Sequence, residues 1–440
     1  MKVSRRFFAL LVAGLAVSAQ AEAATMKLSL NEALQMAREH NSSIKAARSR
    51  VSQADARIVQ SMQAYLPKVK FSETFVHTTD PGANLVFKLQ QEIANPQTDF
   101  APAALNHPPA ITDFQTTVEV VQPLVNVDAM IGRSVAKSAR RAQQFMADRA
   151  VESIELNVKK AYYGLILGRK NVAAIEQSIG IMQGYSKEAS KGYKAGLLTK
   201  SDKLSTDVRL SELREQKLMM ENEIRNAEDA LRTMLSLKGD ERIVPTGDLL
   251  VDAKVPSSVT NASSAGRSDL KALEAYEDVT GYQHDMARAQ WLPRLNAFAQ
   301  QNWHEANLFG TEGSSWTVGL NMQWNLFDGM ATYGKVQEAK AQQLEAKYNY
   351  EAAKDQSSME INKARRAMIT SVERVAVARK SLEEARVSFD FIGEQYRTGM
   401  AMTFELLMRE GAFTYAKMRI NQAKFDYCIA KSELDYFSGR

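Results

Sequence analysis

The sequence has little of the residues that interrupt helices or cross-link chains. Its 440 residues include one cysteine, 10 prolines and 22 glycines. The single cysteine, Cys428, excludes an intramolecular disulfide and a zinc site built from cysteine ligands. We expect its thiol to be buried and inert. Since helix breakers are scarce, long stretches of the chain can remain helical without interruption.

The sequence also lacks long apolar runs and a strong charge of one sign. Beyond the N-terminus no window offers the roughly 18 apolar residues that a membrane-spanning helix needs, and the mean hydropathy of −0.33 excludes a polytopic helical membrane protein. The formal net charge of +5 is small and dispersed, so we expect no nucleic-acid partner. The five histidines are scattered, and no phosphate-binding loop, dinucleotide glycine fingerprint or nucleophile elbow occurs. We therefore expect no enzyme activity, no cofactor and no metal.

Residues 1–23 have the features of an export signal. Lys2, Arg5 and Arg6 form a basic start, an apolar run over 7–19 follows, and small residues allow cleavage after Ala21 or Ala23. The sequence leaves open whether the route is Sec or twin-arginine. No cysteine lies near the cleavage site, so we expect no lipid anchor.

An internal repeat fills the rest of the chain. Tyr193–Leu197 (YKAGL) matches Tyr396–Met400 (YRTGM), and apolar and small residues spaced by three and four match at the same offset on both sides of these motifs. The pattern predicts two copies of one unit, each with a long helical hairpin that turns at Gly196 or Gly399, where positive φ suits glycine.

The repeat also predicts the domain boundaries. We expect a first repeat over 24–238, an irregular linker over about 239–267 and a second repeat over 268–440. The long arms of the hairpins cover about 128–195 and 329–398, and the returning arms cover about 199–238 and 402–437. One further helix precedes each strand pair, at about 29–64 and 267–290, and the first of these opens on a capping-box spacing, Ser29 to Glu32.

Each repeat also contains two segments typical of strands, at about 69–78 and 114–124 in the first and at about 295–304 and 315–327 in the second. The last has the clearest alternation, in which apolar residues take turns with small or polar ones over a length that crosses a bilayer. Its expected lipid-facing residues are Trp316, Val318, Leu320, Met322, Trp324 and Leu326. Four strands cannot close a barrel alone, whereas three chains would supply twelve. A small soluble sheet packed on helices is the alternative.

The order helix, strand, strand, helical hairpin, given twice, resembles the TolC-type outer-membrane efflux factors. The resemblance covers about residues 26–438 and includes LSLNEAL from Leu28, YLP from Tyr65, WLP from Trp291 and the two glycine turns. It implies a mainly α fold with a membrane β-barrel portion: a homotrimer with a twelve-stranded barrel in the outer membrane of a Gram-negative bacterium, which continues into a long helical barrel in the periplasm. It also implies an exit duct for tripartite efflux or type I secretion, joined by a periplasmic adaptor to an inner-membrane pump of the RND or ABC type. A periplasmic coiled-coil adaptor or structural protein without a channel is the alternative.

The resemblance assigns the two turns to the periplasmic end of the duct. The expected adaptor-docking residues are Gly196, Leu197, Leu198, Gly399 and Met400; packing within the turn is an equal alternative for the apolar ones. The expected periplasmic gate consists of Asp202, Tyr193, Tyr396 and Glu405. The family's latch pairs the second tyrosine with the first acid, here Tyr396 and Asp202. A second acid after Glu405 is replaced by Met408, so we expect one acidic ring, although an ordinary solvated helix charge also explains Glu405. The exported cargo is left open.

Overall fold

The structure is a computed structural model that describes residues 25–252, 259 and 263–439, so the expected export signal lies outside the described residues. The chain packs as two units. The first contains Met1–Asn41, Asn157–Ala253 and Ser371–Ile429, and the second contains Ser42–Leu156, Lys254–Thr370 and Ala430–Arg440. Within the described part of the chain, no helix combines the length and apolar character that a bilayer crossing requires.

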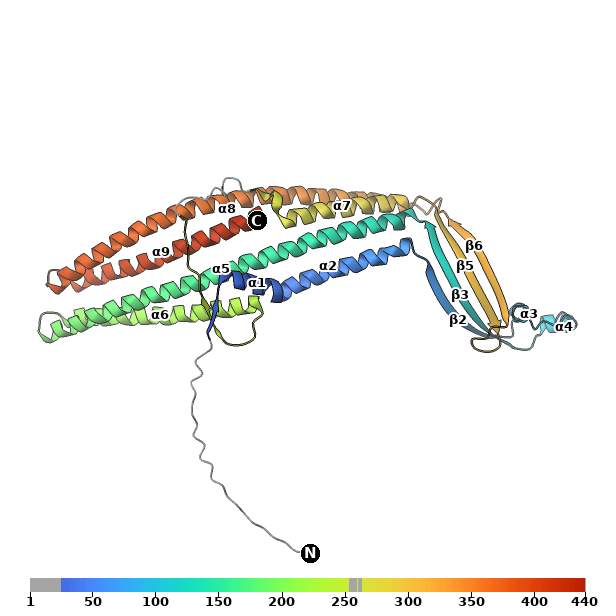
Figure 1. The fold of residues 1–440 in the computed structure, drawn as a ribbon, viewed down its shortest axis with the longest axis horizontal. Helices are drawn as coiled ribbons and strands as arrows, with labels where there is room; N and C mark the ends of the chain where they lie inside the picture. Colours follow the sequence, from blue (N-terminus) through green and yellow to red (C-terminus); the bar gives the residue numbers. More distant parts are fainter. Residues whose placement is uncertain (1–24, 253–258, 260–262, 440) are drawn as a thin grey trace, which may run out of the picture. The chain divides into compact units, whose positions relative to one another are not determined.

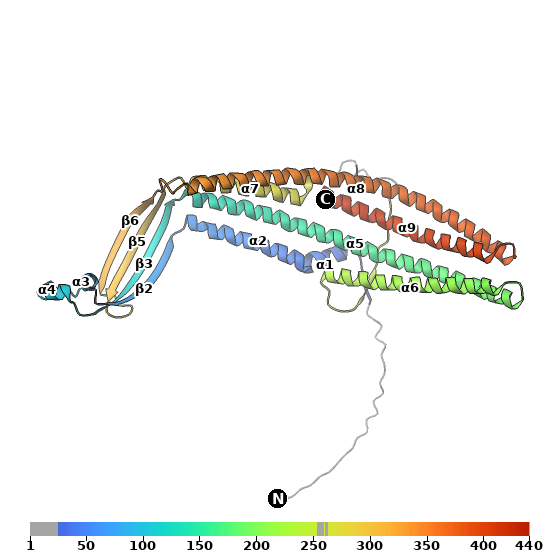
Figure 2. The same ribbon diagram turned by 180° about the vertical axis from the view of Figure 1, so that it is seen from behind.

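The two predicted hairpins are present, with bounds close to those expected. The first consists of α5 (Val127–Lys194) and α6 (Lys200–Leu235), and the second of α8 (Ala331–Arg397) and α9 (Thr403–Ser438). Figure 2 shows both turns at the same end of the first unit. Helix α5 has 68 residues and α8 has 67, and neither contains a proline. The scarcity of breakers therefore has the predicted consequence.

The first predicted helix is interrupted where one continuous helix over 29–64 was expected. It consists of α1 (Leu30–His40), α2 (Ser42–Gln60) and the 3-10 turn η1 (Ser61–Ala64). Asn41 ends α1 with extended backbone, at φ −60° and ψ 126°, and its side-chain amide donates to the carbonyl oxygen of Met234 at 2.8 Å. This bond to a distant residue holds the break, which is why the local pattern did not predict it.

A small parallel sheet in the first unit was not predicted. Strand β1 (Thr25–Leu28) pairs with β4 (Arg242–Pro245), inside the linker that was expected to be irregular. The hydroxyl of buried Tyr162 donates to the Leu28 carbonyl at 3.0 Å and accepts from the Gly247 amide at 3.0 Å. The described linker also contains the short 3-10 turn η3 (Ser264–Gly266).

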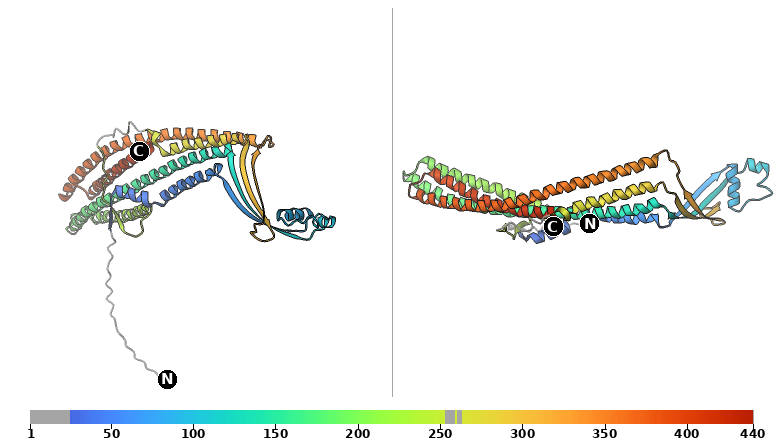
Figure 3. Two further views of the ribbon diagram at one scale, coloured as in Figure 1. Left: turned by 45° about the vertical axis from the view of Figure 1, so that its right-hand side comes forward. Right: turned by 90° about the horizontal axis from the view of Figure 1, so that it is seen from above.

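The second unit contains an antiparallel sheet with the strand order β2-β3-β5-β6. Its strands are β2 (Lys68–Thr78), β3 (Ile111–Val125), β5 (Arg294–Glu305) and β6 (Gly313–Gln323). Helix α2 leads into β2, β3 into α5, α7 (Ser268–Ala289) into β5 and β6 into α8, all at one end of the sheet (Figure 1). At the other end the predicted loop of about 79–112 contains two short helices, α3 (Pro81–Gln90) and α4 (Pro102–Asn106), which lie past the strand ends in both views of Figure 3.

The strand register gives the sheet two different faces. Val69 pairs with Val120, Phe71 with Val118 and Phe75 with Phe114, and the same face carries Trp316, Val318, Leu320 and Met322, all exposed. The opposite face carries mainly polar and charged residues: Lys68, Lys70, Glu119, Arg294, Asn296, Gln300, Asn302, Thr317, Asn321 and Gln323. We call these the apolar face and the inner face. An exposed apolar face of this size on a sheet is typical of contact with lipid or another protein.

The predicted last strand is too long at its C-terminal end. Strand β6 ends at Gln323, which pairs with Arg294, the first residue of β5. The sheet therefore offers no partner for Trp324 and Leu326, which lie in the exposed connection to α8. The indole nitrogen of Trp324 donates instead to the carbonyl oxygen of Trp291 at 3.0 Å.

Candidate functional site at the hairpin turns

The two turns have the same backbone geometry, as the repeat predicts. Gly196 has φ +75° and Gly399 has φ +77°. The amide of Leu197 donates to the Gly192 carbonyl at 2.8 Å, and the amide of Met400 donates to the Gln395 carbonyl at 2.8 Å. These bonds close a Schellman-type C-cap, in which the left-handed residue is normally glycine because a Cβ would be strained there.

The acids after the turns cap the returning helices. Thr199 and Asp202 form a capping box at the start of α6, in which the Asp202 carboxylate accepts from the Thr199 amide at 3.1 Å and from its hydroxyl at 2.6 Å. The Thr199 hydroxyl is the main reason that the pKa of Asp202 is lowered. Glu405 stands at the equivalent place in α9, where it accepts from the Met402 amide at 3.2 Å and is otherwise exposed.

Replacing Thr199 with Ala should loosen the start of α6. The change removes both hydroxyl bonds of the capping box, and the loss of an N-cap costs about 1 kcal/mol. The pKa of Asp202 should rise toward its ordinary value, because its main stabilising donor is gone. The stabilisation from this carboxylate is present above its unfolded pKa and is lost as the pH falls through the lowered folded pKa, so wild type and variant should converge in acid. Amide hydrogen exchange in the first turn of α6, measured against pH, checks this; equal exchange at neutral pH would contradict it.

The structure brings together the two expected latch residues. Tyr396 is buried, and its pKa is raised first by burial and also by the nearby negative charge of Asp202. Its ring packs edge-on against Tyr185, with centroids 5.8 Å apart. Among the described residues, the buried hydroxyls of Tyr396 and Thr403 have no partner at ordinary hydrogen-bond geometry, but the Thr403 side chain is near enough to lower the pKa of Asp202 and to offset part of the rise in the pKa of Tyr396. The matching residue of the first turn, Tyr193, is half-exposed and stands outside this core.

The core under the turns joins all four long helices. Its buried members come from α5, α6, α8 and α9: Met182, Tyr185, Leu210, Leu213, Phe389, Tyr396, Leu406 and Phe413. Leu198 packs against this cluster, and its side chain also covers Gly192. Of the predicted docking residues, Leu198 therefore supports the turn, while Leu197 and Met400 are 81% and 73% exposed.

A groove beside the turns was missed at the sequence level. It lies between α6 and α9 and has a volume of about 820 Å³. Its lining combines an apolar stripe (Leu204, Val208, Phe404, Leu407 and Met408) with polar and charged residues (Lys200, Ser201, Ser205, Arg209 and Glu212). Within this set, the pairs Leu204 and Val208, and Phe404 and Met408, each lie four residues apart and are exposed. This i, i+4 stripe lies off the predicted heptad seam and was the signal that could have revealed the groove.

A buried polar network crosses between the two hairpins near the groove. The guanidinium of Arg209 on α6 pairs with Glu410 on α9 at 2.8 Å, and Glu410 is 1% exposed. The other oxygen of Glu410 accepts from the Thr414 hydroxyl at 2.6 Å, which lies 2.5 Å from the hydroxyl of Ser178 on α5. One buried charge pair and two hydroxyls thus connect α5 and α6 with α9.

This arrangement of strands, hairpins and capped turns is that of the outer-membrane channel proteins. The profile of the outer membrane efflux protein family matches residues 33–236 and 259–440, and the chain belongs to this family. The resemblance found in the sequence is thereby confirmed. Members of the family are channels rather than enzymes, and among the described residues no group of His, Cys, Asp and Glu could hold a metal ion.

Individual relatives are distant in sequence and close in fold. The alkaline protease secretion protein AprF of Pseudomonas aeruginosa is 22% identical over 340 residues, which cover 74% of this chain and 69% of the relative. The outer membrane protein TolC of Vibrio cholerae is 21% identical over 315 residues, which cover 68% and 70%. The structure of the Campylobacter jejuni outer membrane channel CmeC matches with a TM-score of 0.78 at 17% identity, over 93% of this chain and 85% of that one. The predicted fold class is therefore confirmed.

Proposed function

We propose that this protein is the outer-membrane exit duct of a tripartite efflux pump or a type I secretion system. The observation that carries the proposal is the four-stranded sheet with one apolar and one polar face and two unpaired edges, β2 and β6. Open strand edges are not tolerated in lipid. Three copies joined edge to edge give twelve strands, an apolar face toward outer-membrane lipid and the inner face toward an aqueous pore.

The hairpins form the periplasmic part of the duct in this proposal. Helices α5 and α8 have 68 and 67 residues, so each is roughly 100 Å long. The turns, with exposed Leu197 and Met400 and the apolar stripe of the groove between α6 and α9, fit an apolar hairpin of a periplasmic adaptor. The adaptor would in turn engage an RND or ABC pump in the inner membrane, which supplies the energy.

Fractionation tests the location and the assembly. The mature protein should be found in outer-membrane extracts as a species whose electrophoretic mobility on a gel changes after heating. Chemical crosslinking should yield trimers. A monomer in the soluble periplasmic fraction would instead favour the coiled-coil adaptor or structural protein without a channel.

The gate role of Glu405 is a separate part of the proposal. Three exposed Glu405 side chains around a threefold axis would attract cations, because like charges held close together favour counterions. Replacing Glu405 with Ala should reduce cation selectivity and block by divalent cations in planar-bilayer recordings, while Glu405→Asp should keep both. An unchanged response to divalent cations would assign Glu405 only to capping α9 through the Met402 amide.

A further inference from the structure

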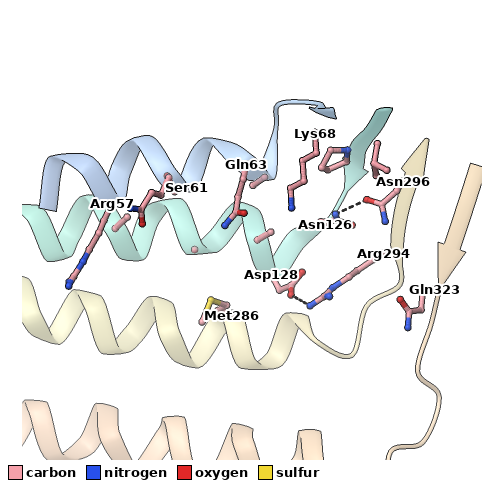
Figure 4. A pocket seen from close by; sticks show the side chains of 17 residues that line it. Arg57, Ser61, Gln63, Lys68, Asn126, Asp128, Met286, Arg294, Asn296 and Gln323 are labelled. Atoms are coloured by element: carbon pink, nitrogen blue, oxygen red, sulfur yellow. Dashed lines mark hydrogen bonds and ion pairs between the residues drawn. The ribbon is translucent and has the colours of Figure 1, made fainter. Parts of the chain in front are cut away.

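A cavity of about 600 Å³ lies in the second unit where the sheet meets the helices (Figure 4). Its strand residues, among them Lys68, Asn296 and Gln323, belong to the inner face of the sheet. The cavity therefore opens on the side away from the apolar face. Its volume lies within the range of pockets that hold small organic ligands.

Helix α5 leaves space for the cavity because it carries small residues on this side. Ala129, Gly132 and Ala136 line the cavity at spacings of three and four, so they share one face of the helix. A Cβ built on Gly132 would stand 3.8 Å from the sulfur of Met286 on α7, which forms the opposite wall. A larger side chain at position 132 would therefore extend into the cavity.

The charge of the lining is mostly positive. Arg57, Lys68 and Arg294 line the cavity, and Asp128 is the carboxylate among the lining residues. Asp128 pairs with Arg294, as the dashed line in Figure 4 shows. Neither Lys68 nor Arg57 has an ion-pair partner among the residues that the structure describes. Two uncompensated cations thus remain at the cavity wall.

The other polar groups complete a surface that suits an oxyanion. Lys68 extends from β2 and Arg294 from β5 toward the start of α5 (Figure 4), where the helix dipole is positive. Asn126, directly before this helix, donates through its amide to the side-chain oxygen of Asn296 at 2.9 Å, which leaves the Asn296 amide as the donor for a ligand. Among the described residues, the buried side-chain oxygen of Asn126 has no partner, so it favours an oxyanion that also carries a hydroxyl or a proton. Cations and amide donors around a helix start favour carboxylate or phosphate groups.

We infer that this cavity binds a small multivalent oxyanion, one that carries carboxylate or phosphate groups. Lys68 and Arg294 are the principal contacts, and Arg57 lies at the far end. The inner face lines the pore in the proposed trimer, so the physiological meaning of this inference rests on the proposed function. In that trimer, three such cavities form a ring of anion-binding sites, here called the collar, at the helix end of the strands. The collar would provide a binding site for anionic cargo on the wall of the duct.

Calorimetric titration of the detergent-purified full-length protein with pyrophosphate, and separately with citrate, at low salt tests the inference. The wild type should bind saturably, and Lys68→Gln should weaken binding about tenfold, as expected for the loss of one charged hydrogen-bonding group. Gly132→Leu, which fills part of the cavity without changing charge, should weaken it similarly. The matched control is Lys70→Gln, which removes the next lysine on the same face of β2 but outside the cavity, and should leave the affinity within about twofold.

Two results would overturn the inference. One is the absence of saturable binding by the wild type, and the other is equal weakening by Lys68→Gln and Lys70→Gln, which would reflect only the general charge of the inner face. Bilayer recordings on the same preparations keep the proposed function separate. A wild-type channel that binds neither anion contradicts only the collar, whereas a protein that binds pyrophosphate but forms no channel contradicts only the duct.

Discussion

Replacing Arg209 with Met is expected to destabilise the first unit, which contains the hairpin turns, by about 3–5 kcal/mol. It should also raise the ion conductance of the resting duct. The variant leaves Glu410, 1% exposed, as a buried carboxylate without its cation, and breaking one side of a buried pair costs about this much. Because the pair connects α6 with α9, its loss should separate the two hairpins near the turns. Denaturant unfolding and single-channel conductance measure the two effects.

The double variant Arg209→Met with Glu410→Leu is the matched control. It removes both charges, and apolar replacements of similar size often restore the stability of a buried ion pair or exceed it. Stability should therefore return while the charge pair is absent. If the single variant is as stable as the wild type, Glu410 is neutralised by other means and the network does not hold the hairpins together.

Replacing Leu197 and Met400 together with Asp is expected to weaken adaptor binding by at least about a hundredfold. Both side chains are exposed and unsupported in the isolated chain, and burial of one large apolar side chain contributes about 1.5–3 kcal/mol. The fold should be unaffected, since the turn geometry depends on the glycines and on Leu198. The affinity of the purified protein for a periplasmic adaptor that it binds measures the effect.

Leu250→Asp is the matched control for the adaptor prediction. Leu250 is 76% exposed and lies in the linker, so the variant introduces one of the two substitutions, Leu to Asp, at a comparable exposure away from the turns. It should leave the affinity unchanged. If the turn variant and the wild type bind the adaptor with equal affinity, Leu197 and Met400 are exposed residues that do not contribute to adaptor binding.

Much of the fold could be predicted from the sequence because the same signals occur in both repeats. The turn motifs at Gly196 and Gly399 fixed both hairpins to within a few residues, and the alternation from Trp316 located the last strand. These signals are local: a heptad seam and a glycine turn are properties of neighbouring residues. Cys428 is buried, as expected.

What the sequence did not reveal depends on partners far along the chain. Strand β4 exists because residues 25–28 pair with it, and α1 ends at Asn41 because the Met234 carbonyl accepts its amide. Strand β6 stops at Gln323 because β5 begins opposite it, although the alternation continues to Leu326. In the candidate site, the sequence identified the turn residues but not which of them are buried. The burial that separates Tyr396 from Tyr193 and Leu198 from Leu197 depends on packing among four helices.

Disulfide trapping between the sheet edges tests the trimeric duct most directly. Cys428 is the only cysteine, so a Cys428→Ala background carries none. Phe71→Cys on β2 is then combined in turn with Val318→Cys, Leu320→Cys or Met322→Cys on β6, all on the apolar face. After oxidation in outer membranes, at least one pair should yield a covalent species of three chains and none larger. Chains that remain monomeric with every pair, or ladders that extend beyond three, would contradict the trimeric duct.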